Sequence, residues 1–132
     1  MPGYATFRIG LPGARIGRWL VSHRAVLVHL ASPFVLGAAG CTAAKRLGLP
    51  VVAVYQTDVP AYARDYHTGG LGEQAAWRWV RRIHNAADRT LAPSTASVQR
   101  LAAHGIERVW MWRRGVDCKR FTPSARSAAL RR

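Results

Sequence analysis

From residue 25 onward, short apolar runs alternate with longer stretches whose apolar residues recur at helical spacing, and this alternation leaves few folds open. The runs are rich in β-branched residues and end at turn residues, which indicates buried strands. They cover residues 25–30, 51–55, 89–92 and 108–112, and the last of them alternates as an edge strand does. Strands that alternate with helices predict an α/β fold with a parallel sheet and flanking helices.

The stretches between the runs carry helix signals at their ends. Ser32 before Pro33 has the pattern of an N-cap followed by proline at the first helical position. Ser94 is predicted to cap a later helix that Gly105 closes. Between these two helices, residues 73–87 place apolar side chains on one face and arginines on the other, which predicts an amphipathic helix.

The residues that directly follow the predicted strands form a candidate binding edge. In an open parallel sheet, ligands gather at the carboxyl ends of the strands. Here those positions hold polar, hydroxyl-bearing and basic residues, at 31–33, 56–58, 93–95 and 113–115. We therefore expect a site along one edge of the sheet.

Length and charge limit the class of protein. The chain has 132 residues, the size of one domain, and a formal net charge of +14. Such a charge suits nucleic acid, an anionic membrane surface or phosphorylated substrates as partners, and does not choose among them. No apolar run reaches the roughly 18 to 20 residues that span a bilayer, and no secretory signal is visible, so we expect a cytoplasmic protein. Cys41 and Cys118 form no metal-binding cluster, so no metal site is expected.

Four ordered segments carry a resemblance to a known family. They are VHLASPFVLGAAG (28–40), LGLPVVAVYQTDVPAYA (47–63), WRWVRRIHNAADRTLAPS (77–94) and RRGVDCKRF (113–121). Together they resemble the N-terminal domain of family 4 glycosyltransferases. The closest look is to the actinobacterial mannosyltransferases related to phosphatidylinositol and glycolipid mannosylation.

The resemblance implies the GT-B arrangement, in which two Rossmann-like domains face a cleft. The first domain mainly binds the acceptor and the second the nucleotide sugar. The implied reaction is a retaining transfer of a hexose, with mannose from GDP-mannose favoured, to a lipid or glycan acceptor, without a metal or other cofactor. Residues 1–121 would form part of the acceptor-side domain, as a partial Rossmann-like sheet. Residues 122–132 would form the hinge and the truncated start of the donor-binding domain.

Several parts of the family's pattern are absent from the sequence. No glycine-rich loop precedes residue 25, and the basic pair and acidic motif of the second domain are missing. The groups that neutralise the departing nucleoside diphosphate belong mostly to that second domain. We therefore expect the chain to be inactive alone, and its catalytic residues stay unassigned.

By resemblance, the acceptor or sugar site would include Ser32, Gln56, Thr57 and Asp58. Gln56 stands where many relatives carry a histidine that contacts the sugar or acceptor. An amide is no general base near neutral pH, but it can form hydrogen bonds with sugar hydroxyls. A structural turn is the other interpretation for Gln56. Asp58 could bind an acceptor hydroxyl or serve as a turn or N-cap residue, and Ser32 is most simply a helix cap.

A second group of residues is expected at the donor phosphate or the interdomain hinge. It comprises Ser94, Arg114, Gly115 and Asp117. A capped helix N-terminus can also contact an anion, so Ser94 can serve both purposes. Glycine allows close approach of the backbone to a ligand, and arginine can meet a phosphate, although an ordinary hinge explains both equally.

The basic face of the predicted helix at 73–87 has three interpretations. Arg78, Arg81 and Arg82 form a solvated face, a surface for anionic lipid headgroups, or a nucleic-acid contact, in that order of preference. A basic binding module without catalysis, for membrane or nucleic acid, is therefore the alternative to a transferase. A remnant that no longer folds well is a further one.

Two histidines are assigned to structure rather than chemistry. His29 lies within an apolar strand and is expected to be a core residue with its polar groups satisfied. His84 is expected to serve packing or to lie on the surface. Neither is favoured as a ligand or a catalytic group.

Overall fold

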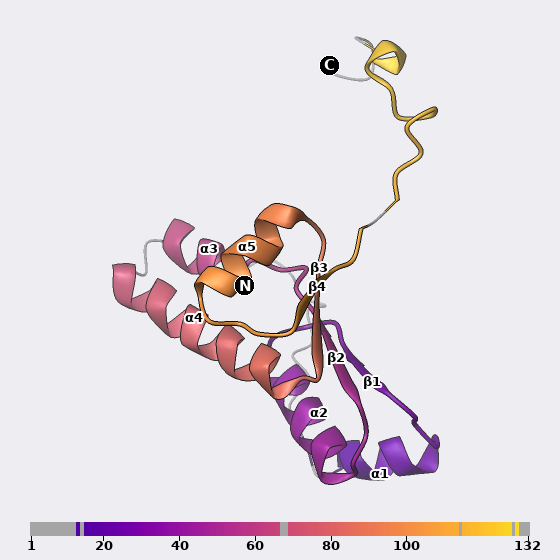
Figure 1. Cartoon of the computed structure of the whole chain (residues 1–132), viewed down its shortest axis with the longest axis vertical. Coiled ribbons are helices and arrows are strands. Elements are labelled where there is room, and N and C mark those ends of the chain that lie inside the picture. Colours follow the sequence, from indigo (N-terminus) through magenta and orange to yellow (C-terminus); the bar gives the residue numbers. More distant parts are fainter. Residues whose placement is uncertain (1–12, 14, 67–68, 114, 128, 130–132) are drawn as a thin grey trace.

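A computed structural model describes residues 13, 15–66, 69–113, 115–127 and 129. Its centre is a four-stranded parallel sheet in the order β1-β2-β3-β4 (Figure 1). The strands are β1 (Val28–Leu30), β2 (Val51–Val54), β3 (Arg89–Ala92) and β4 (Val109–Met111). The parallel α/β sheet predicted from the sequence is therefore confirmed, with β4 at an edge.

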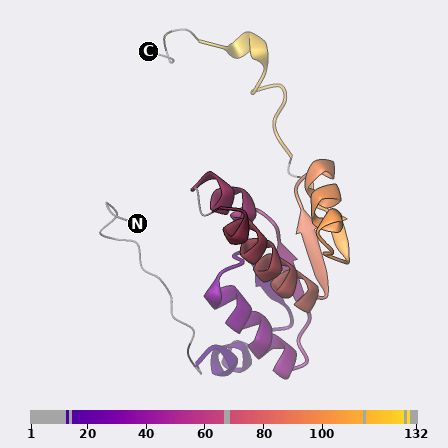
Figure 2. The ribbon, with the colours of Figure 1, turned by 90° about the vertical axis from the view of Figure 1, so that its left-hand side faces the viewer.

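One helix of the described chain precedes the first strand, and the others occupy the connections between the strands. The helices are α1 (Arg15–Ser22), α2 (Val35–Arg46), α3 (Val59–Asp65), α4 (Gly69–Ala86) and α5 (Thr95–Ala103), and a 3₁₀ turn covers Pro123–Ala125. Each strand pairs with the next one along the chain, so right-handed crossovers place α2, α4 and α5 on the same face of the sheet. Figure 2 shows α2 and α4 lying next to each other in this layer.

The core lies between this helical layer and the sheet, in two clusters. The first joins β1 and β2 to α2 and α4, with buried Leu30, Cys41, Ala44, Val51, Ala53, Ile83 and Ala87. The second joins β3 and the end of β2 to α4 and α5, with buried Tyr55, Trp77, Val80, Ala92, Leu101 and Ile106. Burial of these apolar side chains is the main term that stabilises the layered arrangement.

The opposite face of the sheet carries no helix of the described chain. His29 is exposed there, Val52 and Leu91 are half-buried, and Trp110 is 55% exposed. The prediction that His29 is a core residue is therefore wrong. Its side chain points away from the helices and meets the ring of Trp112 edge-on, with ring centroids 6.2 Å apart.

The outer strands are shorter than the sequence predicts. Val26 and Leu27 precede β1 and are 83% and 48% exposed. The neighbouring strand β2 begins too late to pair with Val26 and Leu27. The pairing of the two strands starts at Val28, whose backbone N–H donates to the carbonyl of Pro50, just before β2. Arg108 stays outside β4 because its φ of 53° is incompatible with a strand.

The start of α2 also differs from the prediction. The helix begins at Val35 with Phe34 as its N-cap, and no side chain caps it, so Ser32 is not the cap. The carbonyl of Ser32 instead lies against Gly37 in the first turn, where a Cβ atom would collide with it. Ser32 thus lies outside the helix, and its backbone approaches that of Gly37 closely.

Candidate functional site

The carboxyl ends of β1, β2 and β3 bring several predicted site residues to one edge of the sheet. Gln56 follows β2, and its Nε2 donates a hydrogen bond of 2.6 Å to the carbonyl of Ala31, which follows β1. Ser94 follows β3, and its Oγ accepts a hydrogen bond from the Ser97 amide at 3.1 Å. The predicted capping of α5 by Ser94 is confirmed.

A pocket of about 450 Å³ lies at this edge, between the end of β2 and α3. Its lining contains three of the predicted acceptor-side residues, Gln56, Thr57 and Asp58, together with Ala61, Tyr62 and Asp65. The amide, hydroxyl and carboxylate groups provide both donors and acceptors for hydrogen bonds. This combination suits a ligand with several hydroxyl groups, and no apolar ligand would satisfy it.

Asp58, which lines the pocket, has two structural partners. Its Oδ1 accepts a hydrogen bond from the Ala61 amide at 3.0 Å and so caps α3. Its Oδ2 accepts from the Arg100 guanidinium of α5. The interpretation of Asp58 as a helix cap is confirmed, and because a carboxylate has about four lone-pair positions, capping leaves capacity for a ligand hydroxyl.

Three residues of this region, Tyr62, Asp65 and Arg100, were not predicted from the sequence. Tyr62 and Asp65 lie four and seven positions after the cap of a short helix, which places them on the same face as Asp58. That periodicity was available from the sequence. Arg100 gave no such signal, because only the tertiary fold brings this residue of α5 to Asp58.

A buried tyrosine lies beneath the pocket. Tyr55 is 6% exposed, and its hydroxyl lies near Asp58 without forming a hydrogen bond of good geometry among the described residues. Burial, and to a lesser degree the Asp58 carboxylate, raises the pKa of Tyr55 well above its usual range. The phenol therefore stays neutral at physiological pH and presents no charge to the pocket.

His84 packs beneath the same region rather than in the pocket. It is 2% exposed, its Nδ1 lies 3.1 Å from Thr90 Oγ1, and its ring meets Tyr55 edge-on. Burial lowers the pKa of His84 to about 4, so the ring is neutral near pH 7. The prediction of a packing role is confirmed.

The other predicted residues that the structure describes lie apart from the pocket. Ser32 follows β1 with an exposed side chain and does not line it. Gly115 and Asp117 belong to the segment that leaves the sheet after β4 (Figure 1). The Asp117 carboxylate accepts from the amides of Lys119 and Arg120, each at 3.0 Å, within its own turn. Arg114 lies outside the described residues.

Two further properties concern the described residues only. No three histidine, cysteine, aspartate or glutamate side chains among them gather as metal ligands would. No helix in the same part of the chain is long and apolar enough to cross a membrane.

Comparison with known proteins decides the family. The model for Glycosyltransferase Family 4 matches residues 1–120. The chain belongs to glycosyltransferase family 4. The resemblance seen in the four ordered segments is thus confirmed, and the sheet is part of a glycosyltransferase domain.

Individual relatives of this family 4 chain are mannosyltransferases and a sulfoquinovosyl transferase by name. A GDP-mannose-dependent alpha-mannosyltransferase of Mycobacterium tuberculosis is 53% identical over 99% of the chain and 34% of the relative. One of Corynebacterium glutamicum is 46% identical over 94% of the chain and 30% of the relative. A sulfoquinovosyl transferase of Arabidopsis thaliana is 36% identical over 80% of the chain and 21% of the relative.

The chain therefore spans about a third of the length of the mannosyltransferases that it matches. No solved structure was found to match it.

Proposed function

We propose that this family 4 chain supplies part of the acceptor-side domain of a retaining mannosyltransferase. The donor would be GDP-mannose and the acceptor a lipid or glycan, with no metal or other cofactor. The identity to GDP-mannose-dependent alpha-mannosyltransferases supports the donor and the sugar. Within the chain, residues 1–121 would form the acceptor-side part, and residues 122–132 the hinge and the start of the donor side.

The observation that carries the proposal is the pocket at the end of β2. Gln56, Thr57 and Asp58 line it with hydrogen-bonding groups at the strand edge where α/β domains bind their ligands. Gln56 would form hydrogen bonds with sugar hydroxyls, and Asp58 would accept from one of them. Ser32 lies outside this pocket, after β1, and would meet only an acceptor that extends beyond it.

Saturation-transfer NMR with methyl α-mannoside tests this assignment. We expect transfer to the ligand in the 132-residue chain and at least about a fivefold weaker signal in Gln56→Leu, because the substitution leaves a sugar hydroxyl unpaired. Gln99→Leu is the matched control, since Gln99 is an exposed glutamine of α5 that does not line the pocket. Equal signals from the two variants would show that the sugar does not bind at Gln56 in this pocket.

We propose further that the chain does not transfer sugar by itself. Neutralisation of the departing nucleoside diphosphate is a large part of the catalysis of such a reaction. The chain spans about a third of the length of its mannosyltransferase relatives. Only four of its residues are assigned to the donor phosphate or the hinge, namely Ser94, Arg114, Gly115 and Asp117. Incubation with radiolabelled GDP-mannose and a lipid extract should give no product, and measurable turnover would contradict this part.

The third part of the proposal concerns location, at the inner face of the cytoplasmic membrane. Arg78, Arg81 and Arg82 are exposed on α4, and none has a carboxylate partner among the described residues. Such a face attracts anionic headgroups, each arginine contributing about 1 kcal/mol near the surface. Sedimentation with phosphatidylglycerol vesicles should deplete the chain from solution, and vesicles of phosphatidylcholine should not. Equal sedimentation with both, or stronger retention by DNA in a gel shift, would favour the alternative partners.

A further inference from the structure

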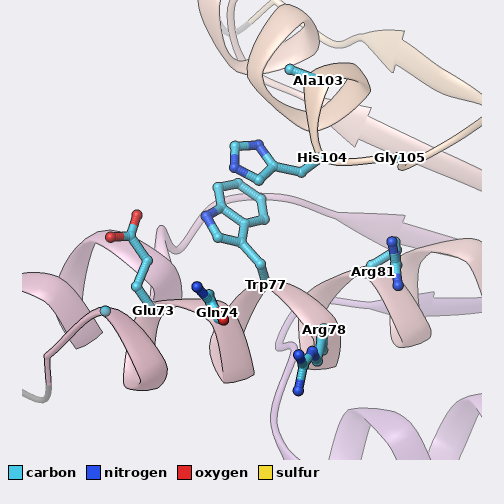
Figure 3. A pocket seen from close by; sticks show the side chains of 9 residues that line it. Glu73, Gln74, Trp77, Arg78, Arg81, Ala103, His104 and Gly105 are labelled. Carbon is cyan, nitrogen blue, oxygen red and sulfur yellow. The ribbon is translucent and has the colours of Figure 1, made fainter.

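A second pocket lies between α4 and the turn that leads from α5 to β4 (Figure 3). It measures about 620 Å³, within the range of small-molecule sites. Its polar and aromatic walls come from Glu73, Gln74, Trp77, Arg78, Arg81 and His104, none of which lines the pocket at Gln56. We propose that this pocket binds a small phosphorylated polyol or sugar, with the phosphate held by Arg81 and Arg78.

The basic end of the pocket has the charge that a phosphate needs. Arg78 and Arg81 are three residues apart on α4, so their side chains start from neighbouring positions on the helix surface. In the part of the chain that the structure describes, neither guanidinium has a carboxylate within ion-pair distance. Guanidinium groups bind phosphate through two parallel hydrogen bonds, which an ammonium group cannot do.

Arg81 lies beside the turn opposite α4, at Gly105. Gly105 has a φ of 73°, a left-handed conformation that glycine adopts without strain. A Cβ atom at this position would lie 3.5 Å from Cδ and 3.7 Å from Nη1 of Arg81. The Arg81 side chain therefore lies within van der Waals distance of Gly105, and Figure 3 shows Arg81 directed to this side of the pocket.

The other end of the pocket has acceptors for hydroxyl groups. Glu73 lies eight residues before Arg81, about 12 Å along the helix axis at 1.5 Å per residue. Its carboxylate pairs with Arg64 at 3.5 Å and has further lone pairs that can accept from hydroxyls, so the two ends orient a ligand that carries both groups. The Nε1–H of Trp77 is buried, has no acceptor among the described residues, and is turned toward the Glu73 side in Figure 3.

The aromatic wall between the two ends is held in place before any ligand binds. The rings of Trp77 and His104 stack with centroids 3.5 Å apart and 10° between their planes. Nδ1 of His104 lies 2.8 Å from the carbonyl of Arg100, which can only accept, so this nitrogen carries the proton. A wall that is already ordered reduces the entropy lost on binding.

A titration of the 132-residue chain with glucose 6-phosphate, followed by ¹H–¹⁵N NMR, tests the proposal. We expect the Trp77 indole and Gly105 amide signals to shift, and glucose without phosphate to leave them in place. Arg81→Gln should weaken binding at least about tenfold, as loss of a bidentate phosphate contact does, and Arg81→Lys should weaken it less. Arg82→Gln is the matched control, because it removes the same charge from an exposed position of α4 outside this pocket.

The outcomes separate the pocket from general attraction to a basic surface. Equal losses in Arg81→Gln and Arg82→Gln, or equal shifts with glucose, would overturn the proposal. Dispersed spectra of both variants confirm that they fold. If phosphatidylglycerol vesicles shift the same signals in an Arg81-dependent way and glucose 6-phosphate does not, the phosphate belongs to a lipid headgroup. Gln56→Leu should leave all these shifts unchanged, so this test is independent of the proposed acceptor site.

Discussion

Arg100 of α5 donates a hydrogen bond to the carboxylate of Asp58, which caps α3 from a position 42 residues earlier in the chain. The contact joins α5 to the start of α3, which lines the candidate acceptor pocket, and both side chains are about one third exposed. Solvent screens a pair of this exposure, so its net contribution is modest. The cap and the ion pair can be separated by substitution.

Asp58→Asn should lower the free energy of unfolding by about 0.5–1 kcal/mol, because an asparagine still caps a helix and only the ion pair is lost. Asp58→Ala removes both contacts and should cost about 1–2 kcal/mol. Urea unfolding followed by circular dichroism at pH 7 measures both values. If the two variants lose the same stability, the cap makes no contribution.

Gly37→Ala should destabilise the protein by about 1–3 kcal/mol, because the new methyl group would collide with the Ser32 carbonyl. Gly40→Ala, in the same helix, should be neutral or stabilise by up to about 1 kcal/mol, since its Cβ would meet only the Leu30 side chain at 3.6 Å. Thermal unfolding of the two variants checks the difference. A stabilised Gly37→Ala variant would show that α2 and the Ser32 segment move apart easily.

Asp88→Ala should cost more than Lys45→Ala, although the two side chains form one ion pair at 2.6 Å. The other oxygen of Asp88 accepts from the Val51 amide at 2.8 Å, and removing it leaves this backbone donor at the start of β2 without its partner. We expect about 1–2 kcal/mol for Asp88→Ala and less than about 0.5 kcal/mol for Lys45→Ala. Chemical unfolding at pH 7 compares them, and equal losses would assign the effect to the ion pair.

Stability should fall as the pH drops from about 6.5 to 4 because of His84. Burial lowers the pKa of the folded His84 to about 4, whereas the unfolded side chain titrates near about 6.5. Within that window the unfolded chain binds a proton that the folded chain does not, so the unfolded state gains up to about 3 kcal/mol. Above pH 7 both states are neutral and this contribution is constant.

Unfolding curves of the chain and of His84→Gln at several pH values measure this effect. The variant should lose most of the slope between pH 6.5 and 4. The Lys45 hydrogen bond, and then the Val51 amide, lower the pKa of Asp88, so its contribution disappears only at more acidic pH and should persist in the variant. A slope that is unchanged in His84→Gln would contradict the assignment to this histidine.

Much of the fold could be read from local patterns. The four apolar runs and the helical spacing between them correctly predicted the parallel sheet, and Ser94 correctly marked the start of α5. The ends of the strands were less predictable, because Val26 and Leu27 have strand-like side chains but no neighbouring backbone to pair with. A strand ends where its partner ends, which depends on residues far away in the sequence.

The same difference applies to the candidate site. The position after β2 indicated Gln56, Thr57 and Asp58, and the structure places all three in one pocket. Arg100, and the second pocket between α4 and the Gly105 turn, had no sequence signal, since both arise from the packing of helices that are separate in the chain.

The sequence by itself determined the strand and helix types, the edge at which polar residues gather and the family, because periodicity and ordered motifs are local properties. Only the tertiary structure decided that His29 faces away from the helices, that Phe34 rather than Ser32 begins α2, and that Arg100 meets Asp58. Each of these three features depends on which surfaces come into contact. Such contacts are set by the packing of the helices against the sheet and not by neighbours along the chain.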